Sequence, residues 1–470
     1  MVFASPVFLF LFLPLTLVLY WLARTTDARN MVLLAMSLLF YAWGEGGYVL
    51  LMLTSIGLNY VFGLLAEREK GKRAIVVVAV VVNLALLAFY KYAGFIVQAL
   101  NPLLHSLGLN DLAIPSVHLP IGISFYTFHA LSYIIDVSRG QVPAQRKPHD
   151  LALYITLFPQ LIAGPIVRYK DIFQEIESRR LLLDDFAAGV SRFIIGLGKK
   201  VLIANTVALP VDGIHALPLG EVTTPLAWLA AICYALQIYF DFSAYSDMAL
   251  GLGRMFGIHF RENFNYPYVS CSVQEFWRRW HISLSTWFRD YLYIPLGGNR
   301  GSAARTYFNL LLVFFLCGLW HGAAWSFIAW GLYHGAFLVI ERAGLAARLD
   351  RAPKAVGWCY TTLVWLFGWV LFRADSFQHA GVLMARMLGI GHEASVIPTA
   401  NVWTWLDARL LTMMVLGVIV MFPLLPWIEE KLGSGAPANL LKLACTLAVF
   451  IVCIASLANS SYNPFIYFRF

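Results

Sequence analysis

Two histidines stand in strongly apolar, tryptophan-rich segments of the chain, where a polar group is costly and therefore informative. His281 lies in EFWRRWHISLSTWFRDYLYIPLGGNR, and His321 lies in FFLCGLWHGAAWSFIAW. A neutral imidazole in a dry pocket can accept a proton from an attacking hydroxyl or thiol and pass it to a leaving group. Each histidine is therefore a candidate catalytic base, and the alternative for each is a buried side chain that only makes a structural hydrogen bond.

The residues around these histidines suggest a substrate channel. Read as one helix, residues 275–289 place Arg278, His281 and Ser285 on a single polar stripe, which typically faces a cavity or pathway. The remaining surface of this helix is largely tryptophan and leucine, and Gly318 and Gly322 leave room for close backbone approach beside His321. We expect four residues of these two segments to line the channel: Arg278, Trp280, Ser285 and Trp320.

A third polar stripe follows from YALQIYFDFSAYSDMALGLG. Tyr234, Gln237, Asp241 and Tyr245 recur at a spacing that puts them on one helical face. This face can line a tunnel, or Asp241 can simply pair with an arginine such as Arg278 or Arg289. We therefore count Gln237, Asp241 and Tyr245 among the channel candidates and expect a structural ion pair for Asp241.

Two other kinds of site are disfavoured. Ser124, His129 and Asp136 are widely spaced, and nothing in their spacing implies a hydrolase triad. The other histidines are scattered, without HExxH or another metal-ligand spacing, so we predict no metal site.

The elements that must position these residues are membrane helices. Of the 470 residues, 60% are hydrophobic and only 13% are charged, which predicts an all-α polytopic membrane protein. The runs near 120–137, 151–167 and 306–320 are candidates for re-entrant or tilted segments. The expected apolar segments are 7–23, 31–44, 48–65, 74–97, 120–137, 151–167, 186–208, 226–252, 306–320, 324–342, 356–373, 408–427 and 439–457.

The charge pattern predicts topology rather than a nucleic-acid partner. The net charge of +8 comes from Lys and Arg in short loops between apolar runs, which fits cytoplasmic loops and contact with anionic lipid. Counting crossings from these loops places the C-terminus on the extracytoplasmic side. We therefore expect a transmembrane domain over 1–457 and an aromatic extracytoplasmic tail over 458–470.

Several motifs together resemble the membrane-bound O-acyltransferase family. They are FWRRWHISLSTWFRDYLYIPLGGN, followed 40 residues after its histidine by WHGAAW, together with LPIGISFYTFHALSYIIDV, FPQLIAGPIVRY and YFDFSAYSDMALGLG. The resemblance is to the bacterial alginate O-acetylation branch, which is similar to the D-alanyltransferase of teichoic acid. It implies a ring of transmembrane and re-entrant helices around a central funnel, in the bacterial inner membrane.

The resemblance also implies a reaction. The family's essential histidine falls on His321, and its second active-site position falls on His281. It implies acetyl-CoA as the acyl donor, no bound cofactor, and transfer to a periplasmic acetyltransferase of the SGNH type that acts with a polysaccharide synthase complex. The acetylated polymer is alginate, cellulose, peptidoglycan or another polysaccharide.

The chain ends in SYNPFIYFRF, an unusually apolar terminus. In the related D-alanylation systems, a separate small membrane protein ends in a similar motif whose tyrosine is proposed to carry the acyl group. The resemblance therefore makes Tyr467 a candidate acyl carrier, with Phe465, Phe468 and Phe470 as anchors. The alternative is a tail that only packs.

Two other functional classes compete with acyl transfer. A transporter or flippase would also use a tunnel lined by polar groups, although the chain shows neither inverted repeats nor paired Gly/Pro-broken helices. A scaffold for a polysaccharide synthase is the third hypothesis.

Overall fold

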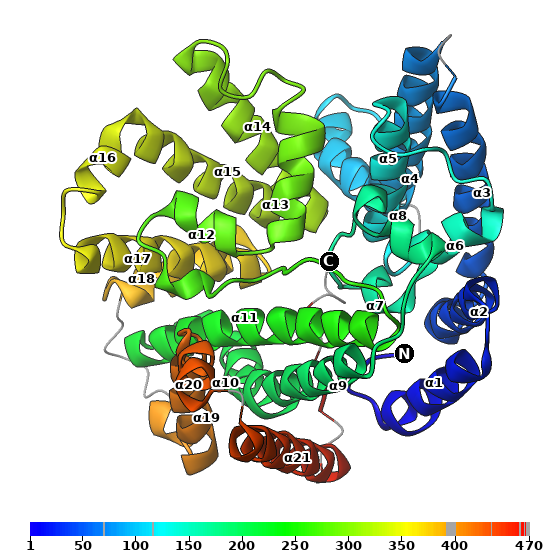
Figure 1. The fold of residues 1–470 in the computed structure, drawn as a ribbon. Helices are drawn as coiled ribbons and strands as arrows, with labels where there is room; N and C mark the ends of the chain where they lie inside the picture. The colour runs from blue at the N-terminus through cyan, green and yellow to red at the C-terminus, as the bar shows by residue number, and fades with distance from the viewer. Residues whose placement is uncertain are drawn as a thin grey trace. The chain divides into compact units, whose positions relative to one another are not determined.

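The computed structural model describes residues 1–68, 71–114, 117–391, 401–433, 435–459, 462–464 and 466. Every regular element in this part of the chain is helical (Figure 1), so the predicted all-α fold is confirmed. The expected funnel stays a prediction. Seven described helical segments are long and apolar enough to cross a membrane: Tyr48–Ala66, Lys72–Ser106, Leu183–His215, Thr224–Met255, Ala303–His321, Lys354–Arg373 and Ala436–Asn459.

The chain divides into two compact units. The first contains Met1–Phe193 and Met248–Arg261. Within it, α2 packs against α6, and α3 and α4 pack against α5. Its helices are η1 (Phe8–Phe12), α1 (Leu13–Leu22), α2 (Thr26–Glu45), α3 (Tyr48–Ala66), α4 (Lys72–Ser106), α5 (Ile123–Ser138), α6 (Pro148–Thr156), α7 (Phe158–Leu161), α8 (Tyr169–Glu177) and most of α9 (Leu183–Gly198).

The second unit contains Ile194–Asp247 and Glu262–Phe470. Within it, α14 packs along α15, which packs on α17. Its elements are η2 (Lys199–Ala204), α10 (Asn205–His215), η3 (Leu219–Glu221), most of α11 (Thr224–Met255), η4 (Pro267–Val269), α12 (Val273–Arg279), α13 (Ile282–Phe288), η5 (Arg289–Tyr293), α14 (Ala303–His321), α15 (Trp325–Ile340), η6 (Glu341–Leu345), α16 (Ala346–Leu349), α17 (Lys354–Arg373), α18 (Phe377–Met387), η7 (Val402–Thr404), α19 (Ala408–Val420), α20 (Leu424–Leu432) and α21 (Ala436–Asn459).

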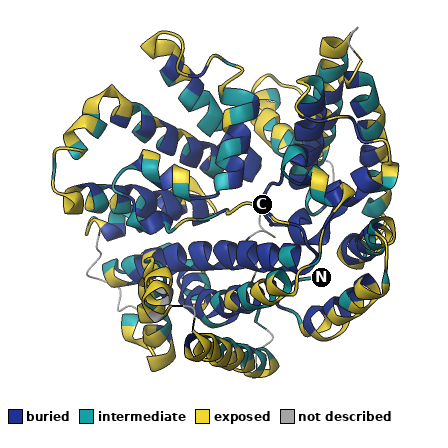
Figure 2. Cartoon of the chain, viewed as in Figure 1, coloured by how far each residue is buried: buried dark blue, intermediate teal, exposed yellow. Residues whose placement is uncertain are grey.

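Burial separates two kinds of membrane helix in the second unit. Figure 2 shows α11 buried along most of its length and α21 exposed along most of its length. An apolar helix that the protein does not cover has lipid as its natural surroundings. A helix that is buried on all sides instead contributes its polar groups to the interior of the protein. We therefore expect α11 to carry buried functional side chains.

Two of the expected segments are interrupted. The run 151–167 contains the end of α6 and the short helix α7, with Leu157 between them in a non-helical conformation directly before Phe158 and Pro159. The run 408–427 is broken between α19 and α20, where Pro423 lies. Proline lacks the N–H that a continuing helix needs and restricts the residue before it. Composition alone did not reveal either break.

Candidate active site

The crossing of α14 and α15 positions His321, the last residue of α14. The Cα atoms of Gly318 and Gly331 face each other here, and a Cβ atom on Gly318 would collide with the carbonyl oxygen of Phe327. Glycine therefore allows the two backbones to approach as closely as they do. The expected close approach at Gly318 is confirmed, whereas the space beside Gly322 is filled by the ring of Phe327.

The imidazole of His321 lies among aromatic rings. Its ring centroid is 4.9 Å from that of Trp320, 5.1 Å from that of Trp330 and 5.2 Å from that of Phe372. His321 also lines a small cavity of about 20 Å³, room for roughly one water-sized group. The other described lining residues are apolar or aromatic: Ile238, Phe242, Trp280, Trp330, Trp369, Phe372 and Ile466.

His281 lies at a break between two helices, so the predicted continuous helix over 275–289 is wrong. Helix α12 ends at Arg279, Trp280 is extended, and α13 begins at Ile282. His281 itself has φ of 45° and ψ of 54°, in the left-handed region. The predicted stripe is therefore not formed.

The left-handed conformation of His281 is rare for a residue with a side chain. In the described part of the chain only Tyr266 shares this property among non-glycine residues. Such strained positions cluster at functional sites, because the surrounding structure must hold them against their cost.

The surroundings of His281 also indicate a functional site. The residue is 1% exposed, and its ring meets that of Phe242 edge-on at 4.6 Å and lies 6.1 Å from that of Trp320. Neither ring nitrogen has a hydrogen-bond partner within the described residues. Buried polar atoms of this kind are uncommon and call for an explanation such as a ligand. His334 shares this lack but lies in the regular helix α15.

The two helices that flank His281 are each capped at their first residues. Asn263 accepts hydrogen bonds from the backbone N–H of Ile282 and Ser283, which begin α13. The Glu341 carboxylate accepts from the N–H of Val273 at 2.6 Å, at the start of α12. These caps satisfy helix N–H groups that otherwise lack partners and thereby fix the direction of both helices.

Helix α11 contributes to the site through a different face from the one expected. Ile238 and Phe242 line the cavity, whereas Gln237 and Tyr245 are buried but absent from its described lining. Asp241, on the same face as Gln237, pairs with Lys200 at 2.5 Å. A structural ion pair was expected for Asp241, but its partner is a lysine rather than Arg278 or Arg289.

The structure thus brings together some of the predicted residues and leaves others apart. His321 and Trp280 line one cavity, and Trp320 contacts the rings of both histidines. Arg278 is exposed on α12 and Ser285 is half-buried on α13, and neither is among the described residues that line the cavity. Tyr467 lies outside the described residues, although Ile466, the residue before it, lines the cavity.

A histidine at the edge of a small, apolar cavity can move a proton while excluding water. Excluding water favours transfer of an acyl group to an alcohol over its hydrolysis. The geometry is therefore compatible with acyl transfer.

Comparison with known proteins decides the family. The model of the membrane-bound O-acyltransferase family matches residues 123–378, more than half of the chain and including both histidines. The chain belongs to the membrane-bound O-acyltransferase family. It is accordingly a multi-pass membrane protein and an O-acyltransferase, which favours this class over the transporter and scaffold hypotheses.

Three relatives illustrate the range of similarity to this O-acyltransferase. A probable alginate O-acetylase AlgI of Azotobacter vinelandii is 43% identical, with 100% of each chain covered. A peptidoglycan O-acetyltransferase of Helicobacter pylori is 35% identical over 83% of this chain and 80% of its own. A teichoic acid D-alanyltransferase of Bacillus subtilis is 27% identical over 77% of this chain and 95% of its own.

Sequence reasoning missed four residues that shape the site of this O-acyltransferase: Lys200, Asn263, Glu341 and Ile466. Lys200 lies in an apolar run of the sequence, where a buried charge is energetically costly. That cost could have marked Lys200 as a candidate site residue. The partners of the other three are 19 or more residues away in the chain, and no local pattern indicates them.

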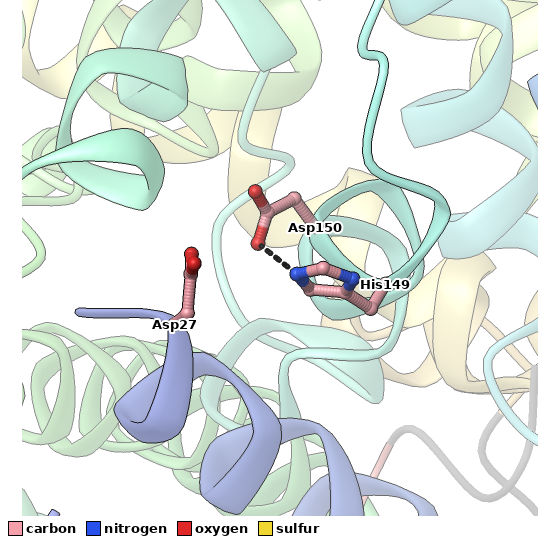
Figure 3. Close-up of side chains that lie close together, drawn as sticks. All are labelled: Asp27, His149 and Asp150. Carbon is pink, nitrogen blue, oxygen red and sulfur yellow. Dashed lines mark ion pairs between the residues drawn. The ribbon is translucent and has the colours of Figure 1, made fainter. Parts of the chain in front are cut away.

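One group in the first unit has the composition of a metal site. Asp27, His149 and Asp150 lie close together (Figure 3). The Lys147 ammonium, 2.7 Å from Asp27, holds the pKa of that carboxyl below its usual range. Asn30 donates to the Asp150 oxygen that faces His149. Because these partners already neutralise or hydrogen-bond both carboxylates, the group fits an ion-pair network, and the absence of a metal stays a prediction.

Proposed function

We propose that this protein transfers acetyl groups from acetyl-CoA, at the cytoplasmic face of the bacterial inner membrane, toward a polysaccharide outside. The observation that carries the proposal is the small apolar cavity at His321, which Ile466 also lines. The relatives described as an alginate O-acetylase and a peptidoglycan O-acetyltransferase support acetyl as the group transferred and a polysaccharide as its destination.

In the proposed reaction, the Tyr467 hydroxyl attacks the thioester carbonyl of the donor. A C–O bond forms to the phenol oxygen and the C–S bond breaks. His321 accepts the phenol proton and returns it to the leaving thiolate, so the products are O-acetyl-tyrosine and free thiol. His281 orients the reacting groups or stabilises the developing oxyanion.

The acetylated tail then presents its ester on the extracytoplasmic side. A second enzyme, proposed to be a periplasmic acetyltransferase of the SGNH type working beside a polysaccharide synthase complex, takes the acetyl group. Its nucleophile forms a new ester as the tyrosine ester breaks, which restores the free Tyr467 hydroxyl. A tethered carrier supports transfer across the membrane because the bulky donor never has to cross.

The test uses Tyr467→Phe, which keeps the ring and removes the nucleophilic hydroxyl. We expect polysaccharide acetylation to fall to background while the purified variant keeps its thermal stability. Mass spectrometry of the wild-type C-terminal peptide after incubation with acetyl-CoA should show a gain of one acetyl group, absent in His321→Ala. Full acetylation by Tyr467→Phe would exclude the relay, and the tail would then serve packing alone.

A further inference from the structure

The described residues of the tail are held by polar groups of the second unit. The Tyr462 hydroxyl donates to Asp212 at 2.6 Å, and Asn205 donates to the side chain of Asn463 at 3.4 Å. Further along, Lys200 donates to the Pro464 carbonyl. The backbone N–H of Ile466 donates to Asp241 at 2.9 Å. Polar contacts therefore extend along the described tail up to the residue that lines the His321 cavity.

Two aspartates in this region each bind a cation with one carboxylate oxygen and the tail with the other. Asp241 uses Oδ1 for Lys200 and Oδ2 for the N–H of Ile466. Asp212 uses Oδ1 for Arg373, at 3.1 Å, and Oδ2 for the hydroxyl of Tyr462. Each carboxylate is thus shared between a fixed cation and the tail.

The Lys200–Asp241 pair is nearly inaccessible to solvent, with 3% and 2% of the two side chains exposed. Burying two charges is expensive unless further hydrogen bonds satisfy their remaining donors and acceptors. Here the tail supplies both kinds of group, a carbonyl to the ammonium and an N–H to the carboxylate. These two backbone groups lie on either side of one residue, so the pair recognises a particular register of the tail.

We propose that Lys200–Asp241 and Arg373–Asp212 form a tail clamp, a set of positioning residues that docks the C-terminal segment reversibly in one register. This inference rests on the proposed carrier function, because the register decides whether the residue after Ile466 reaches the His321 cavity. Each aspartate keeps its cation when the tail leaves, so the clamp remains neutralised while the tail delivers its acetyl group.

A charge swap separates a clamp from an ion pair that only joins helices. In the double variant Lys200→Asp with Asp241→Lys, the two charges are restored but the donor and acceptor offered to the tail exchange places. The Pro464 carbonyl then meets a carboxylate and the Ile466 N–H meets an ammonium. We expect the swap to regain the thermal stability lost by either single variant, while acetyl transfer by the full-length protein stays at least tenfold below wild type.

Hydrogen–deuterium exchange of a C-terminal peptide containing residues 462–466 provides a readout independent of catalysis. We expect faster exchange in the swap than in wild type. Lys199 and Asp247, 2.7 Å apart on the same two elements, provide the matched control. Lys199→Asp with Asp247→Lys should leave tail exchange near the wild-type rate. Wild-type exchange in the Lys200/Asp241 swap, or an equal rise in both swaps, would overturn the clamp.

The same measurements distinguish failure of the clamp from failure of the carrier. Tyr467→Phe should keep wild-type tail exchange because the clamp contacts are intact. If Tyr467→Phe remains fully active, the carrier function is lost while the exchange data still decide the clamp. If Tyr467→Phe is inactive but the Lys200/Asp241 swap is fully active, the carrier stands and the clamp does not.

Discussion

The network around Asn30 in the first unit and the site at His281 in the second unit treat buried polar side chains in opposite ways. In the first unit, Asn30 donates to Asp150 and to the Ile176 carbonyl and accepts from Arg179, which also donates to the Tyr20 hydroxyl. In the second unit, both ring nitrogens of His281 lack a hydrogen-bond partner among the described residues. A network whose members bond to one another stabilises the fold, whereas the ring nitrogens of His281 remain available to a substrate.

The same contrast applies to backbone strain. In the first unit, the described residues with positive φ are all glycine, which tolerates that conformation. In the second unit, Tyr266 and His281 adopt it with full side chains. The first unit therefore follows local preferences, and the second departs from them beside the candidate site. Variants in each unit can test this division.

The largest effect is expected at His321. Removing the base with His321→Ala should lower acetyl transfer about 10²–10⁴-fold, the usual contribution of general acid–base catalysis. Turnover of acetyl-CoA by purified protein measures the effect, and thermal unfolding shows whether the fold persists. His334→Gln is the matched control, because His334 is also buried and also lies beside Trp330, with ring centroids 5.3 Å apart. Equal losses in the two variants would assign His321 a structural role.

The next largest effect is expected on protein stability, from a substitution in the first unit. Asn30→Leu leaves buried partners of Asn30 unsatisfied, which should cost about 1–3 kcal/mol. Thermal unfolding in lipid nanodiscs measures this as a lower midpoint temperature. Turnover per folded molecule should stay within about twofold of wild type, since satisfied networks act on stability. A selective loss of turnover without loss of stability would contradict the division between the units.

A smaller effect is expected for His281→Gly. Glycine adopts positive φ without strain, so we expect the fold to be retained while acetyl transfer falls about 10²-fold through loss of the imidazole. Tyr266→Gly relieves comparable strain without removing a histidine and serves as the control. If His281→Gly matches wild-type turnover, neither the imidazole nor the strained backbone of His281 contributes to catalysis.

The smallest effect is expected from metal removal. A chelator should change neither the unfolding temperature nor acetyl transfer, because Lys147 and Asn30 already contact the carboxylates of Asp27 and Asp150. Titration with Zn²⁺ provides the complementary measurement. A stabilisation by Zn²⁺ that His149→Gln removes would show that the group binds metal and would give the first unit a ligand site as well.

Single-residue signals found part of the site. His281 and His321 were identified because a polar side chain in an apolar, tryptophan-rich run is costly. Asp241 was found by its helical spacing, and the pairing predicted for it is present with a different partner. The channel residues Arg278 and Ser285 were predicted from a continuous helix that the break at His281 removes. Periodicity fails there because the left-handed backbone interrupts it.

The sequence by itself determined the membrane-embedded, all-helical character, the family and the histidines, since these depend on composition and on local motifs. Only the tertiary structure decided which residues meet. Ile466 reaches a cavity with Trp280 and His321, and Lys200 joins Asp241 to the Pro464 carbonyl. The physical reason is that cavities and buried ion pairs arise where distant segments pack, and the spacing within one segment carries no information about its partner in another.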